Sequence, residues 1–462
     1  MSLATARDVA RLFGRAAFGA TKDDLARWVG VEYDTVVDSL FPPATNRAPF
    51  VDEAARLELE KGPAAPTELK TQRWWLDRMR TTPYPLEERM TWFWHTHFAT
   101  AYNAPPTYKN LLVQNQTIRT HALGDFRALV EALTVDAAML YWLSGNTNTA
   151  TAVNENHARE LLELFVAGTI PQRYDENDVK EAAKALTGWY VKGDGTTDFD
   201  ATKHTKGTKT LGGTTIGGHP AGSAAERDEY KEVVAWALGR DTAPLFVAYK
   251  LVASFCYVPT TTNLVAPPGD PQHDELVAAV AAALAPAWSI ADAVKALLKH
   301  PRFRDAPQAS LVRSPVEVTV HLAKAMNVDC DPPAAVADDD ATNANRPIFP
   351  LRRMGQVPFK PPNVGGWPKG ERWLSATTTL GRYSLPIHLD LAAKNQNTYT
   401  TFPLPASTDA AGWATYLGLG ELDPLTAEQL GEFLVASRTA TEPVKQLGIL
   451  VVLTMSPQWQ VM

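Results

Sequence analysis

The sequence predicts a mainly α-helical protein with a small β excursion, and two observations support this. Apolar residues recur at helical spacing through most of the 462 residues. One Gly- and Thr-rich stretch, 191–223, loses that periodicity and is typical of a short hairpin or flap. We therefore expect one large helical domain over 1–462, with 191–223 as an insertion and a Pro/Gly/Trp-rich loop at 354–375.

Capping patterns mark the first helices. Thr5 with Asp8, and Thr21 with Asp24, have the spacing of a capping box and precede apolar triplets. Residues 67–98 are expected to form one or two long helices. Further helices are predicted at about 108–121, 124–133, 155–167, 176–189, 224–238, 242–257, 273–285, 289–299 and 314–326. A final helix near 426–437 is expected to begin with a Thr426/Gln429 capping box, and 62–66 and 331–347 are expected as loops.

Composition limits the classes of function. The net charge is 44 − 51 = −7, and no block of five or six basic residues occurs, which argues against a dedicated nucleic-acid surface. No run of about 18 apolar residues is present to span a bilayer. Because the first residues carry no apolar signal core, we expect a soluble, cytoplasmic protein, or an exported one if a leader has been removed. Cys256 and Cys330 provide neither a disulfide framework nor a CxxC metal motif.

The most informative stretch is 154–168, Asn-Glu-Asn-His-Ala-Arg-Glu-Leu-Leu-Glu-Leu-Phe-Val-Ala-Gly. As a helix it has an apolar stripe of Ala158, Leu161, Leu162 and Phe165. Its polar side chains share one sector of roughly 140°: Glu155, Asn156, Arg159, Glu160 and Glu163. This sector is either a solvated ladder of i, i+4 ion pairs or the wall of a polar pocket. Asn156 favours the pocket, because asparagine is a poor residue for a helix interior and only Asn154 is explained as an N-cap.

The second candidate is the aromatic run Met90 to Phe98, which contains His95 and His97. On a continuing helix these two imidazoles point about 200° apart and cannot ligate one ion. If the helix ends there, both can converge, since His-x-His is a common metal-ligand spacing on extended backbone. The alternative is one hydrogen-bonded core histidine and one surface histidine.

The loop at 354–375 contains Trp367 and Trp373 among prolines and glycines. One interpretation is a rigid aromatic loop that lines a ligand groove and stacks on sugars. The favoured interpretation is a loop fixed to the helical core by buried tryptophans.

The chain resembles a bacterial family, domain of unknown function 1800. The matching segments, in order and covering nearly the whole chain, are Arg15–Gly19, Phe93–Phe98, Asn154–Phe165, Asp178-Val179 with Ala185–Trp189, Ser314–Glu317, Pro361–Pro368 and Ser456–Gln460. The sequence departs from the family pattern at His157, where tyrosine is usual, and at Arg11, where histidine often opens the first motif. His157 is therefore not taken as a ligand.

The resemblance implies no known reaction. It implies that members are often exported and often encoded beside a second family related to phosphatases and sulfatases, which is the predicted protein partner. A small-molecule or glycan ligand is also expected.

From these residues we expect an enzyme, a hydrolase or oxidoreductase, with a polar pocket between two facing motif helices. A divalent metal would be bound by His95, His97 and Glu160 or Glu155, and Arg159 would hold an anionic substrate group. A metal-free variant uses Glu155 and Glu160 as acid and base, with Asn156 beside them. Asp178, Trp189 and the hairpin at His204 would close the pocket. The competing hypothesis is a scaffold or binding protein whose Glu–Arg–Asn–His network only fixes helix packing.

Overall fold

The computed structural model describes residues 2–43, 67–103, 105–305, 311–330, 348–396, 398–400 and 402–461. It confirms the mainly α-helical class with a small β excursion. The loops predicted at 62–66 and 331–347 lie outside the described residues.

The first helices begin where the capping patterns predict. Thr5 and Thr21 each form a complete capping box. Two helices cover 67–98, because Pro83 and Pro85 interrupt the helical pattern and Pro85 opens the second helix. The helices of this part are α1 (Ala6–Ala16), α2 (Lys22–Trp28), α3 (Tyr33–Ser39), α5 (Glu68–Thr81), α6 (Pro85–His97), α7 (Tyr108–His121), α8 (Phe126–Thr134), α9 (Ala137–Trp142) and the 3₁₀ turn η1 (Gly145–Thr147).

The predicted helix at 155–167 changes type along its length. Helix α10 (Asn156–Glu160) continues as the π-helix η2 (Leu161–Val166), in which the Ala167 N–H donates to Leu162 O at 3.0 Å. Helix α11 (Glu176–Ala185) ends earlier than predicted, since strand β1 (Trp189–Val191) already begins before residue 191. The excursion is two antiparallel pairs, β1 with β2 (Thr197–Phe199) and β3 (Thr208–Leu211) with β4 (Thr214–Gly217).

The remaining elements return to helix. They are α12 (Ala224–Arg227), α13 (Glu229–Leu238), α14 (Thr242–Phe255), α15 (Glu275–Leu284), α16 (Ile290–Lys299), α17 (Pro301–Asp305), α18 (Pro315–Ala325), α19 (Ile348–Met354), η5 (Gly370–Leu374), α20 (Ala376–Asn395), η6 (Thr398–Thr400), α21 (Ala410–Tyr416), α22 (Pro424–Ala436), α23 (Glu442–Met455) and α24 (Pro457–Gln460). The predicted Thr426/Gln429 capping box is wrong. Helix α22 starts one turn earlier, with Asp423 as N-cap and Pro424 at its first position.

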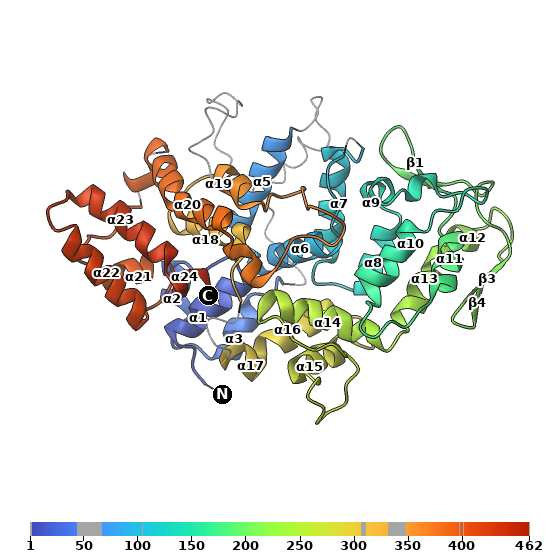
Figure 1. Cartoon of the computed structure of the whole chain (residues 1–462), viewed down its shortest axis with the longest axis horizontal. Helices are drawn as coiled ribbons and strands as arrows, with labels where there is room; N and C mark the ends of the chain where they lie inside the picture. The colour runs from blue at the N-terminus through green and yellow to red at the C-terminus, as the bar shows by residue number, and fades with distance from the viewer. Residues whose placement is uncertain are drawn as a thin grey trace.

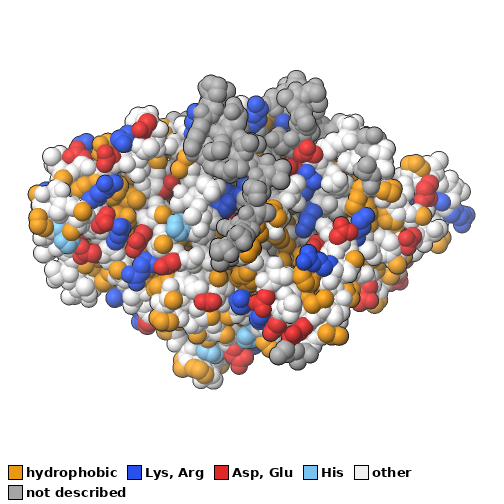
Figure 2. All heavy atoms as spheres, turned by 180° about the vertical axis from the view of Figure 1, so that it is seen from behind, with side chains coloured by type: hydrophobic (Ala, Val, Ile, Leu, Met, Phe, Trp, Pro, Cys, Tyr) orange, Lys and Arg blue, Asp and Glu red, His pale blue; other side chains and the backbone are white. Residues whose placement is uncertain are grey.

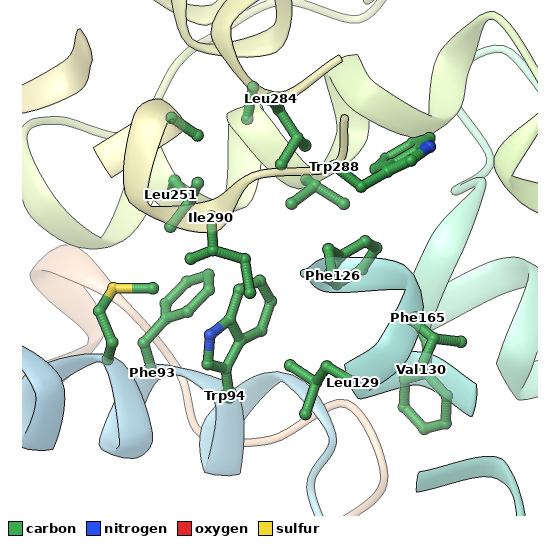
Figure 3. Packing of buried hydrophobic residues seen from close by; sticks show 14 of the residues in the cluster. Phe93, Trp94, Phe126, Leu129, Val130, Phe165, Leu251, Leu284, Trp288 and Ile290 are labelled. Carbon is green, nitrogen blue, oxygen red and sulfur yellow. The ribbon is translucent and has the colours of Figure 1, made fainter. Parts of the chain in front are cut away.

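Two hydrophobic clusters organise these helices around α6 (Figure 1). One cluster joins α6 to α8, η2 and α14–α16; Figure 3 shows Phe93 and Trp94 of α6 facing Phe126, Leu251 and Ile290. The other contains Trp75 and Trp92 and continues into α18–α24. Because Phe93 and Trp92 are adjacent in sequence, α6 is buried on both sides and places its residues between the clusters.

The C-terminal end of the chain lies beside α1 in Figure 1. Arg15 of α1 donates to Val461 O at 3.0 Å and joins the first helix to the last residues. Basic and acidic side chains are interspersed over the face shown in Figure 2. Within the described ranges, no helix has the length and apolarity needed to cross a bilayer.

Candidate functional site

His95 and His97 lie in the last turn of α6 and face different surroundings. His95 Nε2 accepts a hydrogen bond from the Phe359 N–H at 3.2 Å, with its ring packed against Trp75. His97 Nε2 lies 2.9 Å from Phe165 O, so this nitrogen carries the proton and donates. The rings are 1% and 8% exposed, and burial lowers the pKa of each to about 3. Both are neutral near pH 7 and are held by backbone groups.

The expected metal centre is therefore not assembled. Among the described residues, no group of three His, Cys, Asp or Glu side chains is placed to hold a metal ion. The physical reason is that α6 stays helical through His97, which keeps the imidazoles of His95 and His97 on different faces. The two motif helices do meet, through the His97–Phe165 hydrogen bond and through the packing of Phe98 on Phe165.

The polar sector of the 154–163 helix is an ion-pair ladder. Both ends of the Arg159 guanidinium bind the Glu176 carboxylate, at 2.8 and 2.7 Å, and Nη2 also lies 3.2 Å from Glu155. These side chains are one-third to two-thirds exposed, and pairs of this kind contribute about 0.2–1 kcal/mol. Asn154 accepts from the Asn156 N–H, and the Asn156 side chain donates to Leu143 O at 3.3 Å. The ion pairs account for Glu155 and Arg159, and these hydrogen bonds account for Asn156, without a ligand.

Glu160 differs from its neighbours. Its half-buried side chain has a raised pKa, because burial disfavours the charge and Glu163 lies nearby. Glu155 pairs with Arg159 and does not share this environment. The prediction that Glu155 and Glu160 act together as acid and base stays a prediction.

The residues expected to close the pocket fasten the hairpins instead. Asp178 accepts from the Gly212 N–H at 2.6 Å, and Trp189 is buried. His204 lies 2.9 Å from Thr187 O and 3.4 Å from Glu229, which also pairs with Lys209 at 2.5 Å. This network is 1–2% exposed and ties the β excursion to α13.

A pocket of about 50 Å³ lies where α6, α14 and the start of α18 meet the 354–375 loop. That volume admits a group of a few atoms. The aromatic wall contains Trp92, Phe93, Trp367 and Trp373. Trp367 stacks on Trp92 with ring centres 5.2 Å apart, and Trp367 and Trp373 are each 4% exposed. These values confirm a loop fixed by buried tryptophans.

Gly366 lets the loop approach α6. Its φ is +79°, and a Cβ at this position would lie 2.4 Å from Thr96 O. Only glycine fits both the left-handed backbone and this close approach. The next residues, Trp367 to Lys369, are thereby held against the pocket.

One ion pair forms the polar floor of the pocket. Arg89 Nη2 lies 2.6 Å from Glu317 Oε1, and the other oxygen of Glu317 accepts from the Ser314 N–H at the start of α18. Arg89 also donates to the carbonyl oxygens of Arg15 and Ser254. Both carboxylate oxygens of Glu317 are therefore already bound, one by Arg89 and one by the Ser314 N–H. A second cation in the pocket has no carboxylate partner among the described residues.

That cation is Lys369. Its Nζ donates to Ser254 Oγ at 2.6 Å, and both half-buried side chains line the pocket. Within the described part of the chain, no carboxylate oxygen lies within ion-pair distance of Nζ. Burial lowers the pKa of Lys369 to about 7; Lys250 and Arg89 contribute in the same direction, and Glu317 opposes them. A serine hydroxyl thus lies beside an amine that is half-deprotonated near neutral pH.

Residues 11–461 match the model of a family described as a protein of unknown function (DUF1800). The chain belongs to this family. No curated protein and no solved structure matches the chain.

Three of the segments that indicate DUF1800 meet at the pocket. They are Phe93–Phe98, Ser314–Glu317 and Pro361–Pro368, which supply Thr96, Ser314, Glu317 and Trp367 to its lining. Sequence reasoning missed Ser254 and Lys369. Lys369 directly follows the third segment. Its partner Ser254 lies in the mainly apolar helix α14, where no sequence motif marks it as a candidate site residue.

Proposed function

We propose that this DUF1800 chain is a hydrolase of the acyl-transfer class, with Ser254 as nucleophile and Lys369 as general base. The observation that carries the proposal is the 2.6 Å contact between Lys369 Nζ and Ser254 Oγ in a solvent-connected pocket. Serine–lysine pairs are a known variant of the serine nucleophile with an adjacent base.

The chemistry needs only these two side chains, an acyl substrate and water. Neutral Lys369 takes the hydroxyl proton as Ser254 Oγ forms a bond to the substrate carbonyl carbon. Collapse of the tetrahedral intermediate breaks the bond to the leaving group, which departs with the proton from Lys369. Water then attacks the acyl-serine with Lys369 again as base, releasing the acid and restoring the hydroxyl.

Ser254 is the best placed of the pocket hydroxyls. Ser314 accepts from the Glu317 N–H as an N-cap, and Thr96 donates to Trp92 O. Ser254 also donates to a backbone carbonyl, Lys250 O at 2.9 Å, but it alone contacts an amine. A rotation about its Cβ–Oγ bond turns the hydroxyl proton from that carbonyl toward Nζ and leaves the oxygen in place.

The pocket volume favours a small acyl group over a stacked sugar ring, so we propose a small-molecule substrate rather than a glycan. The competing function is the scaffold, in which the Lys369–Ser254 hydrogen bond only attaches the loop to α14. The partner related to phosphatases and sulfatases stays a prediction under either function.

Labelling with a fluorophosphonate separates these two functions. We expect wild-type protein to gain one adduct on Ser254, identified by peptide mass spectrometry, and Ser254→Ala to gain none. Lys369→Met should lose at least about 99% of the labelling rate, since a general base contributes about 10²–10⁴-fold. Because half-protonation falls at about pH 7, the labelling rate should rise about tenfold per pH unit below 7 and level off above it.

Ser384→Ala is the matched control. The Ser384 hydroxyl also donates to a carbonyl of its own helix, Gly381 O at 2.9 Å, and no lysine contacts it in the described residues. This variant should label like wild type. An unlabelled Ser254 in folded wild-type protein would overturn the proposed function and leave the scaffold.

A further inference from the structure

Lys250 lies one helical turn before Ser254 on α14. Residues four apart share a face of a helix, and the Lys250 carbonyl accepts the Ser254 hydroxyl. The half-buried side chain extends along this face, with Nζ 5.0 Å from the centre of the Phe246 ring. The Lys250 backbone therefore contacts the nucleophile, while its amine extends along α14 toward Phe246.

The charge around Lys250 is unbalanced. The described residues place no carboxylate within ion-pair distance of its Nζ, and the same holds for Lys369. The charged and titratable groups near the pair are Arg89 and His97 of α6 and Glu317 of α18, and Glu317 is already bound to Arg89. Neutral His97 cannot compensate a cation. Lys250 thus adds a second positive charge that acts on Lys369, and neither amine has a carboxylate partner among the described residues.

Repulsion between these groups has a chemical use. Lys250 favours the neutral form of Lys369, which a general base requires. Burial lowers the pKa of Lys250 as well, so an anion brought beside its amine would favour the charged form. A negative group on the substrate would supply that anion and would gain strength from the low dielectric of the pocket.

We infer that Lys250 determines specificity, and that the substrate of Ser254 carries a carboxylate close to its acyl group, which Lys250 binds. This inference rests on the proposed function. The substrate class is a small dicarboxylic acid derivative, esterified or amidated at one end and ionised at the other. The acyl group occupies the pocket while the free carboxylate lies along α14.

Two esters with one leaving group test the inference. They are p-nitrophenyl acetate and mono-p-nitrophenyl succinate, which differ in the free carboxylate. We expect wild-type protein to have the higher kcat/KM for the succinate. Lys250→Met should lower that value about 10- to 100-fold, the usual range for one charge-assisted contact, and change the acetate value at pH 9 less than about threefold.

Two further variants test whether the charge of Lys250, and its place beside the pocket, cause the preference. Lys250→Arg keeps the charge and should restore most of the preference for the succinate. Lys22→Met removes a lysine that also lies over a phenylalanine ring, Phe402, but far from the pocket on α2, and should leave both esters unaffected. Lys250→Met should also shift the pH dependence of acetate hydrolysis to higher pH, because the repulsion on Lys369 is gone. Equal losses for both esters would overturn the inference.

Binding of free succinate is measured without catalysis. It should raise the Tm of wild-type protein and of Ser254→Ala, and leave Lys250→Met unchanged. If succinate raises the Tm only when Lys250 is present, but Ser254 is never labelled, the proposed function is wrong and the anion site is retained. No effect of succinate on wild-type Tm would overturn the anion site itself.

Discussion

At the scale of single residues, His97 stabilises a helix end. The ring lies against Phe93 and Phe98, and Nε2 donates to the Phe165 carbonyl where the π-helix ends. A carbonyl in the last turn of a helix has no partner within that helix. The side chain therefore joins α6 to η2 through a group that would otherwise be buried and unsatisfied.

His97→Ala should lower the free energy of unfolding by about 2–4 kcal/mol, from the orphaned carbonyl and the vacated volume. Urea unfolding measures this loss. His97→Gln keeps an N–H donor and should lose less. The folded fraction of His97→Ala should still label at Ser254, and a stable variant that fails to label would assign His97 to the reaction.

At the scale of elements, the 354–375 loop is held by contacts of its backbone as well as by tryptophans. Gly366 meets the Thr96 carbonyl at the end of α6, immediately before the loop supplies Lys369 to the pocket. The docking of this loop therefore sets the distance between Lys369 and Ser254.

Gly366→Ala should weaken that docking. The change adds the strain of a positive φ, about 1–2 kcal/mol, and a clash with Thr96 O. Gly213→Ala is matched to it, because Gly213 has the same φ of +79° with nothing within 4 Å of an added Cβ. We expect Gly366→Ala to unfold at clearly lower urea than Gly213→Ala and to label Ser254 more slowly. If the two variants unfold at the same urea concentration and label Ser254 at the same rate, the loop accommodates the added Cβ and this prediction is wrong.

At the scale of the whole molecule, burial of neutral histidines makes the fold sensitive to acid. His95, His97, His157 and His321 are each at most 8% exposed, and burial lowers the pKa of all four. Below pH 6.5 the unfolded chain binds protons that the folded chain does not. Stability from this source is complete above about pH 6.5 and is lost as the pH falls toward 3.

Each of these histidines adds a slope of up to about 1.4 kcal/mol per pH unit in that range. His157 tests this most cleanly: its pKa is lowered to about 4, and its ring borders the small apolar cavity formed with Phe98 and Leu133. Urea unfolding of His157→Phe between pH 4.5 and 6.5 should show a shallower slope, by about one proton. An unchanged slope would mean that His157 does not titrate between the two states.

The sequence by itself determined the helical class, the position of the β excursion and the first two capping boxes. These are local properties: periodicity, glycine content and caps act within a few residues. Periodicity also identified the buried stripe from Ala158 to Phe165, but it left open what the polar sector beside it would meet. The predicted start of α22 was wrong, because Asp423 caps the helix and Pro424 occupies its first position, one turn before Thr426.

Only the tertiary structure decided which polar groups come together. His95 and His97 are two residues apart in the sequence, and the helix that carries them keeps their side chains on different faces. Ser254 and Lys369 are 115 residues apart and are in contact. Arg159 binds Glu176 on the next helix, and this ion pair takes the place of the expected ligand. Helix periodicity fixes which way a side chain points from its own axis, and the packing of distant helices and one glycine-hinged loop fixes what it meets.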